Sequence, residues 1–107
     1  MSRAHASSDP FRAIADPTRR AVLDLLRLGE RPVNELARSF DMTQPSLSQH
    51  LRVLRDAGLV AHQRRGRELW YRVQPQKLKP VGDWLAQYEQ FWRHKLRALG
   101  TVLEGEK

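Results

Sequence analysis

A stretch of hydrogen-bonding side chains, mixed with leucines at helical spacing, is the part of this sequence best suited to chemistry. Leu47, Leu51 and Leu54 recur at intervals that place them on one stripe of an α-helix. Pro45, Ser48, Gln49, Arg52 and Asp56 point the opposite way, and the expected contact residues of this segment are Gln44, Ser46, Ser48, Gln49 and Arg52. Gln and Arg form paired hydrogen bonds with the edges of adenine and guanine, and Ser bonds to bases or phosphates. This face therefore predicts recognition of nucleic acid, and the alternative is an ordinary surface helix that only faces water.

A second group of charged side chains surrounds a single glycine. Arg64, Arg65 and Arg67 occupy three of four positions between two short runs of β-forming residues, 59–64 and 68–73. The glycine suits the turn of a β-hairpin, so the pattern predicts a two-stranded hairpin with an arginine-rich tip. Three neighbouring arginines repel one another unless an anion relieves the repulsion. We expect the tip to contact DNA phosphate or a minor groove, and the alternative is a solvated turn.

Caps and periodicity predict the helices that position these groups. Each predicted helix start has a capping residue, a proline or both: Asp9-Pro10, Asp16-Pro17, Pro32 and Thr43. Gly29 and Gly58 are expected to end the second and the fourth helix. The third helix, a tight turn at 41–43 and the fourth helix form a helix-turn-helix, which the basic hairpin follows directly. That order predicts a mostly α winged helix-turn-helix fold of five to six helices with a small β-hairpin.

The segment after the hairpin predicts one long helix, from about residue 79 or 80 to residue 103. Its many aromatic and aliphatic side chains project within a sector of roughly 140° on a helical wheel. A small domain cannot cover that much apolar surface from within, so we expect a homodimer in which this helix packs on the first helix and on its symmetry mate. The expected dimer residues are Phe11, Ile14, Trp84, Tyr88, Trp92 and Leu99. The alternatives are an intramolecular core and a ligand pocket among the aromatic residues.

Length and composition limit the possible classes of protein. The 107 residues suit one domain, 1–107, and 19 Lys and Arg against 12 Asp and Glu leave a net charge of +7, which favours a nucleic-acid partner. The absence of cysteine excludes disulfides and thiolate metal sites. No run approaches the roughly 20 apolar residues that span a bilayer, and the N-terminus lacks the apolar core of a signal peptide. We expect a cytoplasmic protein without a membrane partner.

Catalytic motifs are missing from the sequence. It has no Gly-rich phosphate loop, no nucleophile in a glycine elbow and no His-Glu zinc motif. We therefore expect no catalytic residues, no cofactor and no enzymatic activity.

Four ordered motifs carry a family resemblance. The segments 15–20, 33–37, 44–51 and 54–60 together resemble the ArsR-type family of bacterial winged-helix transcriptional repressors, and the likeness extends over nearly the whole chain. The resemblance implies a homodimer built from the first and last helices. It also implies a recognition helix in the major groove, with Gln44, Ser46, Ser48 and Gln49 as its reading face, and a wing on the flanking backbone or minor groove.

Many members of this family sense metals, and here the sequence departs from their patterns. Metal-sensing members often have a Cys-x-Cys pair in the third helix, where this chain has Val33-Asn34-Glu35-Leu36. Their other common site pairs Asp-x-His with a later His-x-x-Glu in the last helix. The nearest counterparts here begin at Asp83 and His94 but have Leu85 and Arg97 where ligands belong. We therefore expect no metal site.

The sequence thus predicts a dimeric repressor or autorepressor that occupies an inverted repeat overlapping a promoter. One alternative is a metal- or ligand-responsive repressor that uses His5, His62 or His94 in an unfamiliar arrangement. The other is a winged helix that serves as a protein-protein adaptor, although that role requires no arginine-tipped hairpin.

Overall fold

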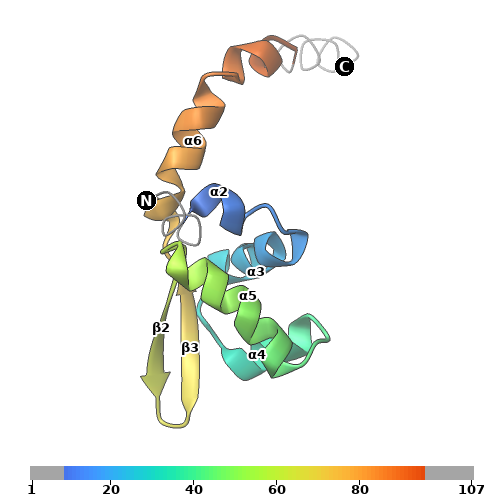
Figure 1. Cartoon of the computed structure of the whole chain (residues 1–107), viewed down its shortest axis with the longest axis vertical. Helices are drawn as coiled ribbons and strands as arrows, with labels where there is room; N and C mark the ends of the chain where they lie inside the picture. Colours follow the sequence, from blue (N-terminus) through green and yellow to red (C-terminus); the bar gives the residue numbers. More distant parts are fainter. Residues whose placement is uncertain (1–8, 96–107) are drawn as a thin grey trace, which may run out of the picture.

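The computed structural model of the chain describes residues 9–95. Within that range the helices are α2 (Pro10–Ala13), α3 (Pro17–Arg27), α4 (Val33–Ser39), α5 (Gln44–Asp56), the 3-10 helix η1 (Pro75–Leu78) and α6 (Lys79–Ala86). The strands are β1 (Arg31–Pro32), β2 (Val60–Arg65) and β3 (Glu68–Val73). Helices α2 to α5 pack into one body, the hairpin of β2 and β3 projects from it, and α6 leads away at the opposite end (Figure 1). The predicted winged helix-turn-helix fold is confirmed.

The predicted helix starts are confirmed by their caps. The Asp9 carboxylate accepts a hydrogen bond from the Phe11 amide, and the Asp16 carboxylate accepts one from the Arg19 amide, both at 3.0 Å. The Thr43 hydroxyl accepts from the Ser46 amide at 3.2 Å. Each bond pairs an amide that the first turn of a helix leaves without an intrahelical partner.

The helix-turn-helix encloses the core. Leu47, Leu51 and Leu54 of α5 are buried as the leucine stripe predicts, and they share the core with Leu26 of α3 and Leu36 of α4. The α4–α5 turn passes through Asp41 at a φ of 51°. Few residues other than glycine adopt this left-handed conformation, and Asp is among those that tolerate it. Core and turn together set which face of α5 points outward.

The hairpin is confirmed, but its turn is shorter than predicted. Arg65 pairs with Glu68 in the antiparallel register, so only Gly66 and Arg67 form the turn, and Arg65 belongs to β2. Gly66 has a φ of 66°, the positive value that a two-residue hairpin turn requires. Because two residues suffice to reverse the chain, the β2–β3 ladder extends to the pair Arg65 and Glu68, which a four-residue turn over 64–67 would not contain.

A third strand, which was not predicted from the sequence, completes the sheet. Strand β1 pairs antiparallel with β3, giving the order β1-β3-β2. It has only two residues, Arg31 and Pro32, and proline lacks an amide for the ladder, so no alternating pattern identifies it.

The prediction of one continuous C-terminal helix is wrong within the described residues. Helix α6 ends at Ala86, residues 87–88 form a turn, and the chain is helical again over 89–95. The amide of Tyr88 bonds the carbonyl of Leu85, and that of Phe91 bonds the carbonyl of Tyr88, both at 2.9 Å. These three-residue bonds tighten the backbone and interrupt the α-helix. Residues 96–103 of the predicted helix, including Leu99, lie outside the described range.

The segment predicted as a plain linker, 74–77, is instead largely the 3-10 helix η1. In residues 9–95, no helix combines the length and the apolar character needed to cross a membrane.

Candidate nucleic-acid interface

The outward face of α5 is the candidate reading surface. Its leucines are buried on one side, and every predicted contact residue on the other side is exposed: Gln44, Ser46, Ser48, Gln49 and Arg52. The Gln44 amide nitrogen donates to the side-chain oxygen of Asn34 on α4, so this glutamine also ties the two helices of the motif together. The structure therefore leaves all five side chains exposed and brings Ser48, Gln49 and Arg52 together on one surface.

A groove of about 310 Å³ lies between α5 and the wing. Its helix side is formed by Ser48, Gln49, Arg52 and Arg55, and its strand side by Leu69 and Tyr71. Arg55 was not among the predicted contact residues. It follows Arg52 by three positions, a spacing that puts both guanidinium groups on one side of the helix. The spacing alone could have suggested that Arg55 lies on the same side of α5 as Arg52. Only the structure shows that this side faces β3 and that Arg55 lines the groove.

The three wing arginines are exposed but have different surroundings. The Arg65 guanidinium bonds the Glu30 carboxylate at 2.8 Å and lies 5.0 Å from the centre of the Trp70 ring. It therefore braces the tip of the wing against the α3–β1 loop. The side chains of Arg64 and Arg67 have no hydrogen bond or ion pair to any other part of residues 9–95, so their charges face solvent.

Two histidines border the interface. The His62 ring on β2 stacks on Tyr71 with centroids 5.3 Å apart, and its Nε2 lies 3.4 Å from Arg55 Nη1. Partial burial lowers the pKa of His62 below its usual value, and the positive charges of Arg55 and Arg64 lower it further. The ring is thus neutral at pH 7. His50 on α5 is half-buried and contacts α3 rather than solvent alone, which favours local bonding over a phosphate contact.

Four of the predicted dimer residues, Phe11, Trp84, Tyr88 and Trp92, are aromatic and exposed. The Phe11 ring of α2 meets Trp84 of α6 edge-on at 5.8 Å, and Trp84 meets Tyr88 at 5.3 Å. Trp84, Tyr88 and Trp92 nevertheless remain 47%, 45% and 41% exposed. The core formed by residues 9–95 does not include them. Ile14 is half-buried and packs against the core.

A separate apolar groove of about 590 Å³ lies between α3 and α6. Leu23, Val73, Leu78 and Val81 are among its lining residues, whereas the exposed aromatic residues are not. Among the described residues, this groove is therefore lined by aliphatic and charged side chains and not by the aromatic residues 84–92.

A metal centre is not formed by the side chains of residues 9–95, where no three His, Asp or Glu residues come close enough to hold an ion. His62 and His94 belong to this range, and His5 lies outside it.

Known proteins resemble this chain in both sequence and structure. The arsR family of bacterial regulatory proteins matches residues 16–62. The transcriptional repressor SdpR of Bacillus subtilis is 35% identical over 78 residues, which cover 73% of this chain and 87% of that protein. The HTH-type transcriptional regulator Rv2034 of Mycobacterium tuberculosis is 33% identical over 106 residues, 99% of this chain and 96% of that one.

A solved structure gives the same result. The crystal structure of an ArsR family transcriptional regulator, 35% identical, superposes with a TM-score of 0.70 and covers 87% of this chain and 94% of that one. Sequence and fold therefore agree over most of both molecules, and the chain belongs to the ArsR family of bacterial regulatory proteins as a DNA-binding transcriptional regulator rather than an enzyme.

Proposed function

We propose that the chain is a homodimeric repressor that binds an inverted repeat in a promoter. The observation that supports this proposal best is the groove shared by α5 and the wing, where exposed Gln, Ser and Arg side chains line one side of a basic surface. Helix α5 enters the major groove, and the wing lies on the flanking backbone or minor groove. A relative is named a transcriptional repressor, which supports repression as the outcome. Because its target is the bacterial chromosome, the protein acts in the cytoplasm.

The side chains divide between reading and anchoring. Gln44, Gln49, Ser46 and Ser48 read base edges, since amide and hydroxyl groups discriminate among the donors and acceptors of the major groove. Arg64 and Arg67 anchor the wing on phosphates, because their charges have no partner in the described part of the chain. Arg65 orients the wing through its contacts with Glu30 and Trp70. Arg52 and Arg55 attract the DNA backbone along the groove between α5 and the wing.

Selection from a random duplex library tests the proposal. We expect enrichment of a two-fold symmetric site with half-site centres about 10 bp apart or a multiple of that spacing. Enrichment of single, unrepeated sites or of no sequence would contradict it. Adding zinc, nickel or copper to the selected duplex tests the metal-responsive alternative, and we expect no release at low micromolar concentration.

Two variants separate reading from anchoring. Gln49→Ala should lose discrimination at particular base pairs by about 1–3 kcal/mol, because a paired contact disappears. Arg67→Ala should weaken all sequences alike and reduce the slope of affinity against salt by about 1, because one phosphate contact is lost. Arg38→Ala, an equal loss of charge on α4, is the control. If Arg67→Ala changed base preference and Gln49→Ala did not, the two roles would be reversed.

A further inference from the structure

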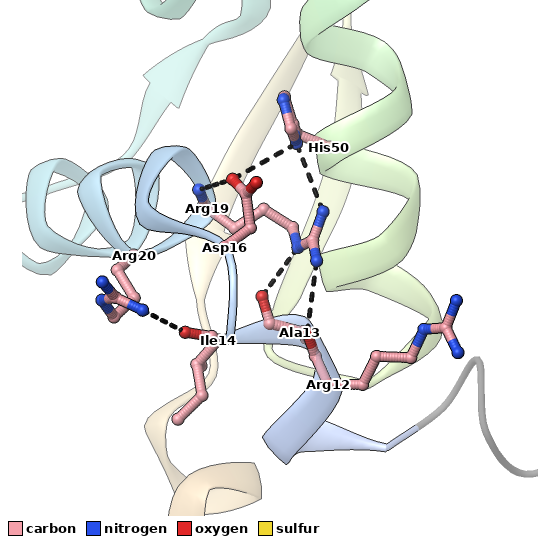
Figure 2. Close-up of polar contacts among 7 residues, drawn as sticks. All are labelled: Arg12, Ala13, Ile14, Asp16, Arg19, Arg20 and His50. Atoms are coloured by element: carbon pink, nitrogen blue, oxygen red, sulfur yellow. Dashed lines mark hydrogen bonds and ion pairs between the residues drawn. The ribbon is translucent and has the colours of Figure 1, made fainter.

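One arginine side chain joins three helices of this molecule. The guanidinium of Arg19, in the first turn of α3, donates from Nε to the carbonyl of Ala13 at 2.7 Å and from Nη2 to the carbonyl of Arg12 at 3.2 Å. Its Nη1 lies 3.4 Å from Nδ1 of His50 on α5. Figure 2 shows the guanidinium between the end of α2 and the recognition helix, with all three contacts made by one planar group.

The end of α2 depends on these contacts. A helix of four residues leaves its last carbonyl oxygens without intrahelical donors. Arg19 donates to two of them, the carbonyl of Ala13 and that of Arg12, which also accepts from the Ala15 amide at 3.2 Å, and Arg20 Nη1 donates to the carbonyl of Ile14 at 2.7 Å. The orientation of α2 is therefore set by the first turn of α3, and Figure 2 shows both arginines reaching back to it.

His50 faces this cluster through a defined atom. A guanidinium only donates, so Nδ1 of the imidazole accepts the bond from Arg19 and the ring carries its proton on Nε2. The Asp16 carboxylate lies 3.8 Å from the same Nδ1 and accepts from the Arg19 amide at 3.0 Å. That amide bond is the largest cause of the lowered pKa of Asp16, with the charge of the Arg19 guanidinium adding to it, so the Asp16 carboxylate keeps its negative charge at neutral pH.

Helix α2 also contacts α6. Phe11 of α2 packs edge-on against Trp84 of α6 at 5.8 Å, so the aromatic surface is linked through α2 and Arg19 to α5. His50 directly follows Gln49 in the sequence. Holding the His50 ring therefore limits rotation of α5 about its own axis, which is the motion that would misalign Gln49 with a base pair.

We propose that Arg19 is a positioning residue for DNA recognition, which fixes the rotation of α5 by binding His50 Nδ1 and the carbonyl oxygens at the end of α2. The proposal rests on the proposed reading face. According to this positioning proposal, His50 contacts Arg19 through Nδ1 and does not bind a DNA phosphate through Nε2.

Two substitutions of one residue distinguish these contacts. His50→Asn keeps a polar atom near the place of Nδ1, whereas His50→Gln extends toward the place of Nε2. We expect His50→Asn to retain affinity for the selected duplex and His50→Gln to lose about tenfold or more, the equivalent of one paired base contact. Asparagine has the lower helix propensity, so a mere loss of helix stability would give the opposite order.

Arg19→Lys provides the second measurement. It keeps the positive charge but cannot bond two carbonyls and an imidazole at once. The selected duplex should bind about tenfold more weakly, while a random duplex at the same salt binds as before, because that binding depends on surface charge. The ratio of the two affinities reports positioning, and a variant that only unfolds loses both. The double variant Arg19→Lys, His50→Gln should show less than the sum of the two effects.

Each outcome bears on a separate claim. Wild-type protein that does not prefer the selected duplex contradicts the proposed function before any variant is tested. If the wild type does prefer it, retained binding by His50→Gln with loss by His50→Asn would assign Nε2 to DNA and overturn the positioning proposal. An unchanged affinity ratio in Arg19→Lys, with melting curves showing a folded protein, would overturn it equally.

Discussion

Five arginines of residues 9–95 fall into two groups according to what their guanidinium groups contact. Arg19 and Arg20 bond backbone carbonyls at the end of α2, and Arg65 bonds Glu30. Arg64 and Arg67 have no such bond within residues 9–95. Composition and spacing identify all of them as basic but do not separate the groups, because the partners of the first group are backbone oxygens or a loop carboxylate distant in sequence. The difference decides which charges are available to phosphates.

His62 makes one contribution to stability depend on pH. Its pKa is lowered in the folded protein, so the unfolded chain binds a proton near pH 6.5 that the folded chain does not. This contribution is therefore present above about pH 6.5 and is lost as the pH falls through the folded pKa. We expect the free energy of unfolding in urea to decrease less between pH 7.5 and pH 5 for His62→Gln than for the wild type.

Asp16 does not interfere with that measurement. Its lowered pKa gives stability that is present above its ordinary value of 3.8 and is lost only at lower pH. Parallel pH profiles for the wild type and His62→Gln would show that the His62 pKa is not lowered by folding.

At the scale of elements, the features that depend on neighbouring residues were predicted from the sequence, and those that depend on distant residues were not. The caps at Asp9, Asp16 and Thr43 and the glycine turn of the hairpin were predicted because each depends on residues within a few positions. Strand β1 and the groove residue Arg55 were missed because they depend on β3, which lies far along the chain. The turn at 87–88 was missed for another reason: it contains no glycine or proline to signal the change.

The turn between α4 and α5 gives a prediction at this scale. Asp41 is exposed and adopts a φ of 51°, so its substitution tests backbone strain with little change in packing. Asp41→Val should lower the free energy of unfolding by about 1–2 kcal/mol, because a β-branched residue is strained in the left-handed region. Asp41→Asn should stay within about 0.5 kcal/mol of the wild type. Equal stability of the two variants by urea denaturation would contradict the observed backbone conformation.

At the scale of the whole molecule, the candidate DNA surface and the aromatic surface lie on different parts of the chain. The wing and the outer face of α5 are basic, whereas α6 and residues 89–95 present exposed rings and extend away from the hairpin (Figure 1). This separation allows two copies to join through their aromatic surfaces while both recognition helices remain exposed. A two-fold axis between them would relate the two half-sites of an inverted repeat.

The aromatic surface gives the corresponding prediction. Tyr88→Asp combined with Trp92→Asp should convert a dimer to monomers, because burying each side chain contributes roughly 1.5–3 kcal/mol and a buried carboxylate opposes association. Sedimentation equilibrium measures the change, and specific DNA binding should fall with it. Gln87→Asp combined with Gln90→Asp adds the same charge at exposed polar positions and is the control. A stable double-variant dimer would place the interface elsewhere.

The short strand β1 has a consequence for aggregation. An open sheet edge is a template for strands of other molecules. Here one edge is a two-residue strand containing Pro32, which offers no amide there, and the other edge, β2, carries Arg64, with Arg67 in the turn that follows it. Arginines that attract DNA thus also repel a second wing during heating or concentration.

We therefore expect Arg64→Thr combined with Arg67→Thr to form β-rich aggregates faster on warming, as measured by light scattering and thioflavin fluorescence. The matched pair Arg27→Thr and Arg38→Thr, which removes the same charge from exposed helical positions, should not. The charge that holds the wing against DNA would then also keep the wings of unbound molecules apart.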